Sequence, residues 1–416
     1  MNLIEYVSST VSWLSTGNAA TTTTSSTSIK SLLLDPPNLS TVSTACPQSS
    51  LMRTGILLFE NLDELVPCAD RLAFVACVVV IRPTQENVRK LARELQRPRF
   101  GSYRVCLTNR TNRMLVKELA EADCHEVVTS VEEIPLDFRP LEAHLFVLGD
   151  EPRQCANERA VEGIAALVGA MNFDQYRMCF LRNSEACQRL APMLRQAQPL
   201  SNLARSSTQG TLILLDRRFD STTPLLNPWT YQAMIQEAFG IRKNIVDMSE
   251  CEGIPRDMAR IVLATEMDSF FATNLYKNFG EIGEIVQSLV AEYQANVQSH
   301  KNISSIGDIK DFVANYPEFK KISGTVSKHV NLISELSRIV STEKLLTISE
   351  VEQSLCCDTF TDTKSILEPL VEIKDRLSQV NARRIMMLCL LRNKFNVEKT
   401  KSDVAHLFKG NVRSLW

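Results

Sequence analysis

Apolar runs and amphipathic helical stretches alternate along the chain up to about residue 150. The runs that predict strands are KSLLLD (30–35), GILLFE (55–60), FVACVVVIRP (74–83), YRVCLTN (103–109), EVV (126–128) and HLFVL (144–148). Between them, ENVRKLAREL places Val88, Leu91 and Leu95 on one helical face, and a second short helix is predicted through VKELAEAD. Continuous apolar strands separated by such helices are typical of a parallel sheet that helices cover on both faces.

The same alternation resumes after residue 150 and then gives way to helices. The strand RMCFL (177–181), a helix through SEACQRLAPML and the strand TLILLD (211–216) predict a second α/β unit. After Gly240 the pattern predicts an almost wholly helical region, with helical spacing at 281–299 and at about 366–409.

A long apolar stripe marks one helix of that region. Its positions step by three or four residues and are Ile322, Val326, Val330, Ile333, Leu336 and Val340. Such a stripe faces the core by default, whereas an exposed part of it would suit a partner helix. Pro317 lies just before the stripe, in YPEF, and predicts a hinge or turn between two helices.

The composition fits a globular chain and argues against some kinds of function. The 416 residues predict two or three domains, and 44% hydrophobic with 23% charged residues is ordinary. A formal net charge of -2 gives no basic excess, so we expect no nucleic-acid partner. No stretch approaches the roughly 20 apolar residues of a membrane span, so any membrane role is expected to come through a partner.

Cysteine and histidine are too scattered to predict a metal site. The 12 cysteines include no CxxC, and no cysteine–histidine cluster has the spacing of zinc ligands. Reduced and mostly buried thiols are expected, which suits the cytosol. Residues 1–14 lack the basic start of a signal peptide, and the Ser/Thr-rich segment 15–29 predicts a flexible spacer.

The stretch LILLDRRFDSTTPLLNPWTYQAMIQEAFGI (212–241) poses a choice between chemistry and structure. Asp216 ends an apolar strand, and Asp220 with Thr222 could complete a metal-dependent phosphoryl-transfer site. The chain has no phosphate-binding glycine loop, DRRFD lacks the closely spaced carboxylates of a phosphatase, and no histidine lies near. The pattern therefore favours a structural role over this enzymatic alternative.

The structural role accounts for more residues of the same stretch. Asn227 suits the N-cap of a helix whose first position is Pro228, and Gly240 suits the left-handed residue after its end. The residues that we assign to this motif are Asp216, Arg217, Asp220, Thr223, Pro224 and Trp229, with arginines 217 and 218 pairing with the two aspartates. The helix face predicted to be buried contains Tyr231, Met234 and Ala238.

Several long segments agree in order and spacing with one family. They are VIRPTQENVRKLARELQRPRFGSY, ELAEADCHEVVTSVEEI, LLDRRFDSTTPLLNPWTYQAMI, GIRKNIVDM, NFGEIGE and IGDIKDFVANYPEFKKISGTVSKHVNLISELSRI. Together these segments resemble the Sec-one/Munc-eighteen (SM) proteins, which are non-enzymatic regulators of SNARE-mediated membrane fusion, and look most like the endosomal branch. The resemblance covers about residues 31–400.

The resemblance implies an α/β plus α fold, an SM-type arch of two parallel-sheet α/β domains and one helical domain. We place α/β domain 1 at residues 1–130, α/β domain 2 at 131–240 and the mainly helical domain 3 at 241–416. Family members continue past the position of Trp416 and return to domain 2. The arch is therefore expected to be truncated at its C-terminus, with a second sheet that lacks its returning strands.

A pocket for the N-terminal peptide of a syntaxin is implied on the outer face of domain 1. Its position falls on VKELAEAD, where Val116 and Leu119 would form an apolar floor. Ala120, Glu121 and Asp123 would lie at its rim and suit a peptide with a Leu or Phe anchor and a basic residue. Leu119 could instead pack in the core, and that alternative stays open.

A helical hairpin that engages SNARE helices is the second implied site. It would be centred on residues 315–321, with Pro317 as the hinge between furled and extended forms. Its residues would be Asn315, Tyr316, Pro317, Phe319, Lys320 and Lys321.

The implied function is SM-type regulation of vesicle docking and fusion. The chain is expected to be a cytoplasmic monomer that binds a syntaxin-type SNARE and the assembled SNARE complex, and reaches endosomal and Golgi membranes only through these partners. No cofactor, metal or catalytic residue is expected, because the mechanism would be binding energy that favours one syntaxin conformation.

Overall fold

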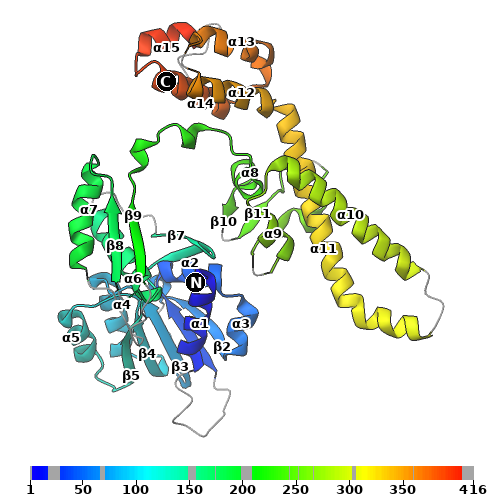
Figure 1. Ribbon diagram of the computed structural model, residues 1–416. Helices are drawn as coiled ribbons and strands as arrows, with labels where there is room; N and C mark the ends of the chain where they lie inside the picture. Colours follow the sequence, from blue (N-terminus) through cyan, green and yellow to red (C-terminus); the bar gives the residue numbers. More distant parts are fainter. Residues whose placement is uncertain are drawn as a thin grey trace. The chain divides into compact units, whose positions relative to one another are not determined.

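A computed structural model describes residues 2–404 except 17–28, 66–70, 149–155, 174, 198–208, 243, 252, 266, 302–305 and 359, without the side chains of 156, 175, 292–301 and 306–322. Most of the Ser/Thr-rich segment thus lies outside the described residues. The chain divides into two compact units, Met1–Asp216 and Arg217–Trp416, each described by itself (Figure 1). The finer boundaries at residues 130 and 240 stay predictions. Among the described residues, no helix is long and apolar enough to cross a membrane.

The first unit is built on a five-stranded sheet. Its strands are β1 (Lys30–Leu34), β2 (Ile56–Asn61), β3 (Leu72–Ile81), β4 (Phe100–Leu107) and β5 (Val128–Glu133). They lie in the order β2-β1-β3-β4-β5, and every pair is parallel. The parallel sheet predicted from the apolar runs is confirmed, and β2 and β5 are its two edges.

Helices cover both faces of this sheet, which explains why its strands are apolar without alternation. Leu33 packs into the core on the side of α4 (Gln85–Gln96) and α5 (Arg113–Ala122). Leu32 and Leu34 pack on the opposite face, with α1 (Leu3–Thr16) and α2 (Pro36–Ala45). The short helix α3 (Gln48–Arg53) and the 3-10 turn η1 (Leu62–Glu64) flank β2 in the sequence.

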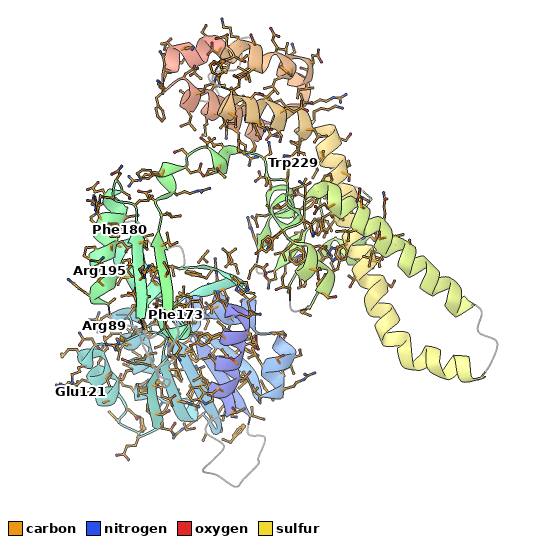
Figure 2. The ribbon with its side chains drawn as sticks, viewed as in Figure 1. Arg89, Glu121, Phe173, Phe180, Arg195 and Trp229 are labelled. Carbon is orange, nitrogen blue, oxygen red and sulfur yellow. The ribbon has the colours of Figure 1, made fainter. Side chains whose placement is uncertain are left out.

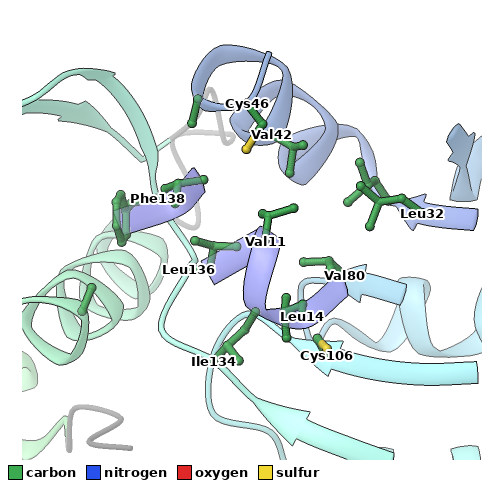
Figure 3. Packing of buried hydrophobic residues seen from close by; sticks show 14 of the residues in the cluster. Val11, Leu14, Leu32, Val42, Cys46, Val80, Cys106, Ile134, Leu136 and Phe138 are labelled. Carbon is green, nitrogen blue, oxygen red and sulfur yellow. The ribbon is translucent and has the colours of Figure 1, made fainter. Parts of the chain in front are cut away.

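Helix α1 is absent from the elements predicted above, although its sequence carries the signal. Its buried positions Leu3, Ile4, Val7, Val11 and Leu14 step at helical spacing. Figure 3 shows Val11 and Leu14 of this helix packed among core residues from the sheet and from the segment around Leu136. Testing the N-terminus only for a signal peptide overlooks this amphipathic pattern.

The expected strand at 144–148 does not belong to the parallel sheet. Instead β7 (Leu145–Val147) pairs antiparallel with β6 (Arg139–Glu142). Only two residues, Ala143 and His144, connect the two strands. Such a short connection forces a hairpin, because a parallel partner needs a crossover of a dozen or more residues.

The second predicted α/β element forms a small layer of the first unit. It contains α6 (Ala156–Ala170), β8 (Gln175–Phe180), α7 (Glu185–Gln196) and β9 (Gln209–Leu214), and the two strands are parallel. Leu214 and the buried residues Cys187, Ala191 and Leu194 of α7 share a small core.

The second unit begins with irregular structure and a small sheet. It contains η3 (Arg217–Phe219), η4 (Thr223–Leu225), α8 (Tyr231–Ala238), β10 (Ile241–Arg242), β11 (Ile245–Asp247), η5 (Arg256–Met258), β12 (Arg260–Val262) and α9 (Ser269–Asn274). The three strands form an antiparallel sheet, so the prediction of an almost wholly helical region is wrong here. Strands of two or three residues are too short to show a period-two pattern.

Two long helices follow, α10 (Phe279–Lys301) and α11 (Ile306–Thr342), and they pack against each other (Figure 1). Most of the predicted stripe on α11 is confirmed as core-facing, since Val326, Ile333, Leu336 and Val340 are buried and Val330 is partly buried. The side chain of Ile322 lies outside the description. Helix α11 continues through Pro317, so the turn predicted there is wrong, and the two helices are joined between Lys301 and Ile306 instead.

The last part of the second unit is a helical bundle. Its helices are α12 (Leu345–Cys357), α13 (Thr363–Ile373), α14 (Gln379–Arg392) and α15 (Val397–Val404), with the turn η6 (Lys374–Arg376). These helices share a core that contains Leu355, Leu367 and Leu388. The helices predicted over about 366–409 are confirmed as far as Val404.

Candidate protein-binding site

Helix α5 carries the residues predicted to bind a peptide, and its first turn is fixed by its cap. The side chain of Asn112 accepts a hydrogen bond from the Met114 N–H at 3.0 Å. On the inner face Leu119 is only 3% exposed and packs in the core with Leu115 and residues of α4. Leu119 therefore has the structural role that the sequence left open. On the outer face Val116 is half-buried and Ala120 is exposed.

The two acidic residues expected at the rim differ in what they do. Glu121 is exposed and lies 3.5 Å from the ammonium of Lys117. Asp123 ends the helix, and its carboxylate accepts hydrogen bonds from the N–H groups of Val127 and Val128 at 2.9 and 3.0 Å. Asp123 thus joins α5 to β5, and its carboxylate oxygens have less acceptor capacity left for a peptide than the sequence indicated.

Helix α5 is tied to the edge strand β5 at both ends. Besides the bonds from Asp123, the carboxylate of Glu133 at the end of β5 accepts from the Thr111 N–H at 2.7 Å, just before the helix. The helix and the strand therefore run side by side in opposite directions. The apolar residues between these two ties belong to one surface.

Edge strand β5 adds apolar residues that sequence reasoning missed. Val131 is 41% exposed. It pairs with Val105, which is buried under α4 and α5, so Val131 lies on the same face of the sheet as α5. We call Val116, Val128 and Val131 the α5–β5 strip. The signal was present in EVVTSVEEI, of which only the first three residues are predicted as strand.

Charged pairs border the strip on the α4 side. Arg89 lies 3.9 Å from Glu118, and the side-chain amide of Gln85 donates to Glu118 at 2.6 Å. Figure 2 shows Arg89 and Glu121 projecting outward from α4 and α5. The border carries both signs of charge, so it suits a peptide that presents an apolar anchor and mixed polar groups.

The second candidate surface is the pair of helices α10 and α11. Asn315, Tyr316, Pro317, Phe319, Lys320 and Lys321 all lie within α11, and their side chains lie outside the description. They stand on a continuous helix rather than on a turn. A proline inside a helix removes one hydrogen bond and bends the axis, and Figure 1 shows that α11 changes direction in its yellow part.

Residues of the motif at 212–241 make structural contacts within each of the two units. In the first unit, the Ser184 hydroxyl donates to Asp216 at 2.6 Å. In the second unit, Arg217 lies 3.6 Å from Asp220, whose carboxylate accepts from the Thr223 N–H at 3.0 Å. Within the residues that the structure describes, no group of three or more metal-ligating side chains occurs.

The expected N-cap of the motif is wrong, because α8 begins at Tyr231 rather than at Pro228. Asn227 is instead buried and donates through its N–H and side-chain amide to Glu352, at 2.9 and 2.8 Å. Arg384 donates to the side-chain oxygen of Asn227 at 2.8 Å. This joint fastens the motif to α12 and α14. The Trp229 indole adds a 2.8 Å bond to the Ser349 hydroxyl (Figure 2).

Helix α8 itself is close to its prediction. Tyr231 and Met234 are buried as expected, whereas Ala238 is exposed because it lies in the last turn. Gly240 follows with a φ of 74°, the left-handed conformation predicted for it.

A buried polar chain joins α8, α9 and α11. The Tyr231 hydroxyl lies 2.8 Å from Nδ1 of His329, and Nε2 of that ring lies 3.0 Å from the carboxylate of Asp268. Lys328 also pairs with Asp268. Burial alone would raise the pKa of Asp268, but its hydrogen bonds with His329 and Lys328 outweigh this and hold the pKa well below its usual range. Because these hydrogen bonds join three elements, we call the four residues Tyr231, Asp268, Lys328 and His329 a structural clamp.

The sequence model of the Sec1 family matches residues 30–415. This chain belongs to the Sec1 family. The human vacuolar protein sorting-associated protein 45 is 37% identical over 382 residues, which are 87% of this chain and 65% of that protein. The Saccharomyces cerevisiae protein of the same name is 36% identical over 341 residues, which are 79% of this chain and 59% of that protein. The chain therefore spans less than two thirds of the length of these relatives.

Solved structures agree with the Sec1-family assignment. "SM Protein Vps45 in Complex with Qa SNARE Tlg2 (1-310)" has a TM-score of 0.87 and 33% identity, over 98% of this chain and 75% of that one. The Unc18–syntaxin 1 complex from Monosiga brevicollis has a TM-score of 0.78 at 18% identity, over 98% of this chain and 76% of that one, which shows the fold alone. The predicted SM family and fold class are confirmed.

The Sec1-family match begins at residue 30, the first residue of β1, so α1 lies before the matched segment. Helix α1 nevertheless completes one face of the sheet, because Val7 and Val11 are fully or almost fully buried against it. The core of the first unit thus includes residues before the segment that the family model matches.

Proposed function

We propose that this Sec1-family chain regulates SNARE-mediated vesicle docking and fusion by binding a syntaxin of endosomal and trans-Golgi membranes. The observation that carries the proposal is the similarity to a Vps45 whose structure was solved with the Qa SNARE Tlg2. The chain would act as a monomer in the cytoplasm and meet endosomal and Golgi membranes peripherally through that partner. It would use no cofactor and catalyse no reaction.

The α5–β5 strip is the surface that we assign to the N-terminal peptide of the syntaxin. Val116 and Val131 supply accessible apolar area beside a helix that is held at both ends. A rigid strip loses little conformational freedom when a short peptide binds, which helps a small contact area to give useful affinity. Ala120 and Glu121 lie on the exposed face of the same helix and would contact the ends of the peptide.

The helix pair α10–α11 is the surface that we assign to SNARE helices. A continuous α11 offers a long template along which a syntaxin helix and the assembling SNARE complex could align. In this proposal Pro317 acts as a bend within the helix rather than as the turn of a hairpin. Binding would favour the assembling conformation of the syntaxin over others, so the differential affinity sets the effect.

Calorimetric titration of the full chain with N-terminal peptides of endosomal syntaxins tests the peptide site. Val116→Arg and Val131→Arg should each abolish micromolar binding, because a buried unpaired arginine costs several kcal/mol, a loss of about a hundredfold or more. Leu57→Arg is the matched control, since Leu57 is 47% exposed on the other edge strand of the same sheet.

Two results would count against this site. If the folded chain binds none of the peptides, binding of the syntaxin through its N-terminal peptide is excluded. The SNARE domain of the syntaxin would then be titrated. Binding that survives Val131→Arg and Val116→Arg, or that Leu57→Arg removes equally, would place the peptide elsewhere.

A further inference from the structure

Two loops meet at one end of the α12–α15 bundle. The guanidinium of Arg392, the last residue of α14, bridges the last turns of α12 and the loop that follows it. It donates to the carbonyls of Ser354 (3.4 Å), Leu355 (3.1 Å), Asp358 and Thr361 (2.6 Å). The C-terminal ends of α12 and α14 therefore lie together. We call the described residues of 358–362 and 393–399 the bundle tip.

The bundle tip carries two aromatic rings that the fold does not bury. Phe360 is 98% exposed, and Phe395 is 72% exposed. Val397 is also exposed beside Phe395. Isolated exposed apolar residues are common on protein surfaces, but two largely exposed phenylalanines at one end of a small bundle are unusual.

The backbone holds the second ring away from the bundle. Lys394 and Phe395 both have left-handed backbone conformations, with φ of 51° and 63°. Residues other than glycine rarely adopt this conformation. Their N–H groups close the end of α14 by donating to Leu391 at 3.1 Å and Leu390 at 2.7 Å. The hydrophobic residue that follows a helix end often folds back onto the helix, whereas this ring points into solvent.

The bundle tip carries charge of both signs, and the positive charge lies beside Phe395. On the loop of Phe360, Asp362 is exposed, and its carboxylate accepts a hydrogen bond from the Lys364 N–H at 3.1 Å. The carboxylate of Asp358 accepts from the N–H groups of Phe360 and Thr361, at 2.9 and 3.0 Å. Glu398 is paired with Lys401 at 3.2 Å. Lys394 and Lys399 are exposed, and neither forms an ion pair with any residue that the structure describes. Two ammonium groups without an ion-pair partner among the described residues therefore flank Phe395.

We propose that the bundle tip binds the surface of an anionic phospholipid bilayer, with Phe360 and Phe395 inserted among the lipid headgroups. Aromatic rings beside lysines are the side chains that settle at a membrane interface, where the ring is sheltered and the ammonium meets lipid phosphate. This contact goes beyond the proposed function, which brings the chain to membranes only through its partner.

A bilayer fits the bundle tip better than a protein partner does. A stable protein interface buries roughly 800 Å² on each side with closely matched shapes. Two rings on separate loops offer little area, whereas a fluid interface accommodates any arrangement of protruding side chains. Two rings alone give a weak and reversible contact, which would add to a second contact by raising the effective concentration.

Flotation of the full chain with vesicles measures the contact. We expect binding at millimolar lipid to phosphatidylcholine vesicles that contain phosphatidylserine. Phe360→Ser and Phe395→Ser should each weaken it by roughly tenfold, and the double variant should fall to background. Lys394→Glu should weaken binding by roughly tenfold or less, and only to the anionic vesicles. Tyr276→Ser is the matched control, since Tyr276 is 70% exposed elsewhere in the second unit.

Depth-dependent quenching supplies a second measurement. The Phe360→Trp variant should keep vesicle binding, and brominated lipids should quench the emission of its added indole more than that of the unmodified chain. Absence of vesicle binding by the folded wild-type chain would overturn the proposal. So would equal binding by the double serine variant. Loss of binding to a soluble syntaxin in that variant, without any vesicle binding, would make the bundle tip a protein contact and would likewise overturn it.

Discussion

The parallel sheet of the first unit and the helical joints of the second unit are held together by different means. In the sheet, fully buried residues such as Leu33, Val79 and Leu91 are apolar, and their fit decides the packing. In the second unit, His329 and Glu352 are almost fully buried and need specific hydrogen-bond partners. An apolar core tolerates a change of shape when its volume is kept, whereas a buried polar joint tolerates no change of chemistry.

Near-isosteric substitutions should give the largest contrast between the two regions. Asp268→Asn keeps the shape of the side chain but leaves Lys328 without its charged partner, so we expect it to cost about 3 kcal/mol of unfolding free energy. Leu91→Met in the sheet core should cost less than about 1.5 kcal/mol.

Hydrogen exchange followed by mass spectrometry measures both variants, because peptides from each unit report on its own opening. Asp268→Asn should accelerate exchange in α9 and α11 and leave β3 and β4 unchanged. Equal and small losses in both variants would show that the clamp contributes no more than ordinary packing.

The same contrast decides how far the sequence predicts the structure. Strands β1, β3 and β4 could be predicted because each strand of a sheet that is buried on both faces is a continuous apolar run in the sequence. The partners of Asn227 could not, because Glu352 is 125 residues away and no local pattern links them. The N-cap assigned to Asn227 failed for this reason, since a good capping residue was needed for a distant contact.

The candidate site divides in the same manner. Helix α5 followed from the sequence pattern, but its faces did not, because Val116 and Leu119 were expected to form one apolar floor and Leu119 is buried in the core. The contribution of Val131 depends on the order of strands in the sheet, which places β5 at an edge. The break predicted at Pro317 was wrong because one missing N–H removes one hydrogen bond from a helix of 37 residues and does not end it.

Substitution of one buried asparagine in each unit compares the contribution of hydrogen-bonded side chains to the stability of the two units. Asn227→Ala removes the side-chain donor from buried Glu352 and the acceptor from Arg384, so we expect a cost of about 2 kcal/mol. Asn109→Ala in the first unit removes one donor from Asp137, which keeps Arg82 and Arg159 at 3.2 and 3.0 Å, and should cost about 1 kcal/mol.

Urea unfolding of both variants, with hydrogen exchange to assign each loss to its unit, checks this order. The control is Asn112→Ala, which removes only an exposed cap. If Asn109→Ala costs as much as Asn227→Ala, buried polar joints matter equally in both units and the contrast between them is incorrect.

Substitutions at two glycines should give effects of similar size to these, but from distinct causes. A Cβ at Gly101 would lie 1.9 Å from the backbone oxygen of Ala73, so Gly101→Ala must shift the strand and should cost about 2 kcal/mol. Gly240 has open space around it, so Gly240→Ala should cost only the roughly 1 kcal/mol of a left-handed backbone. Thermal unfolding of the two variants measures the order, and a larger loss for Gly240→Ala would show that the close approach in the sheet relaxes easily.

The stabilities of the two units should depend on pH with opposite sign. This is the smallest of the effects that we expect. Burial lowers the pKa of His329 below its ordinary value of 6.5, and the hydrogen bond to Asp268 offsets only part of this. The stabilisation from neutral His329 is therefore present above pH 6.5 and lost as the pH falls through its folded value. In the first unit, burial raises the pKa of Asp35 and Asp137. Their contribution is present below pH 3.8 and lost as the pH rises, so acidification does not weaken the sheet through them.

Hydrogen exchange corrected for intrinsic rates, at about pH 7 and about pH 5.5, on either side of the ordinary histidine pKa, tests this difference in sign. Peptides of α8, α9 and α11 should lose protection relative to peptides of β3 and β4 as the pH falls. His329→Gln should flatten the response of the second unit, because glutamine binds no proton in this range and can still hydrogen-bond. Tyr231 and Asp268 face the ring from α8 and from the start of α9, and Lys328 lies beside it. The pKa of Asp268 is held low, so its carboxylate stays charged in this range, and a response that survives His329→Gln would have to come from other groups.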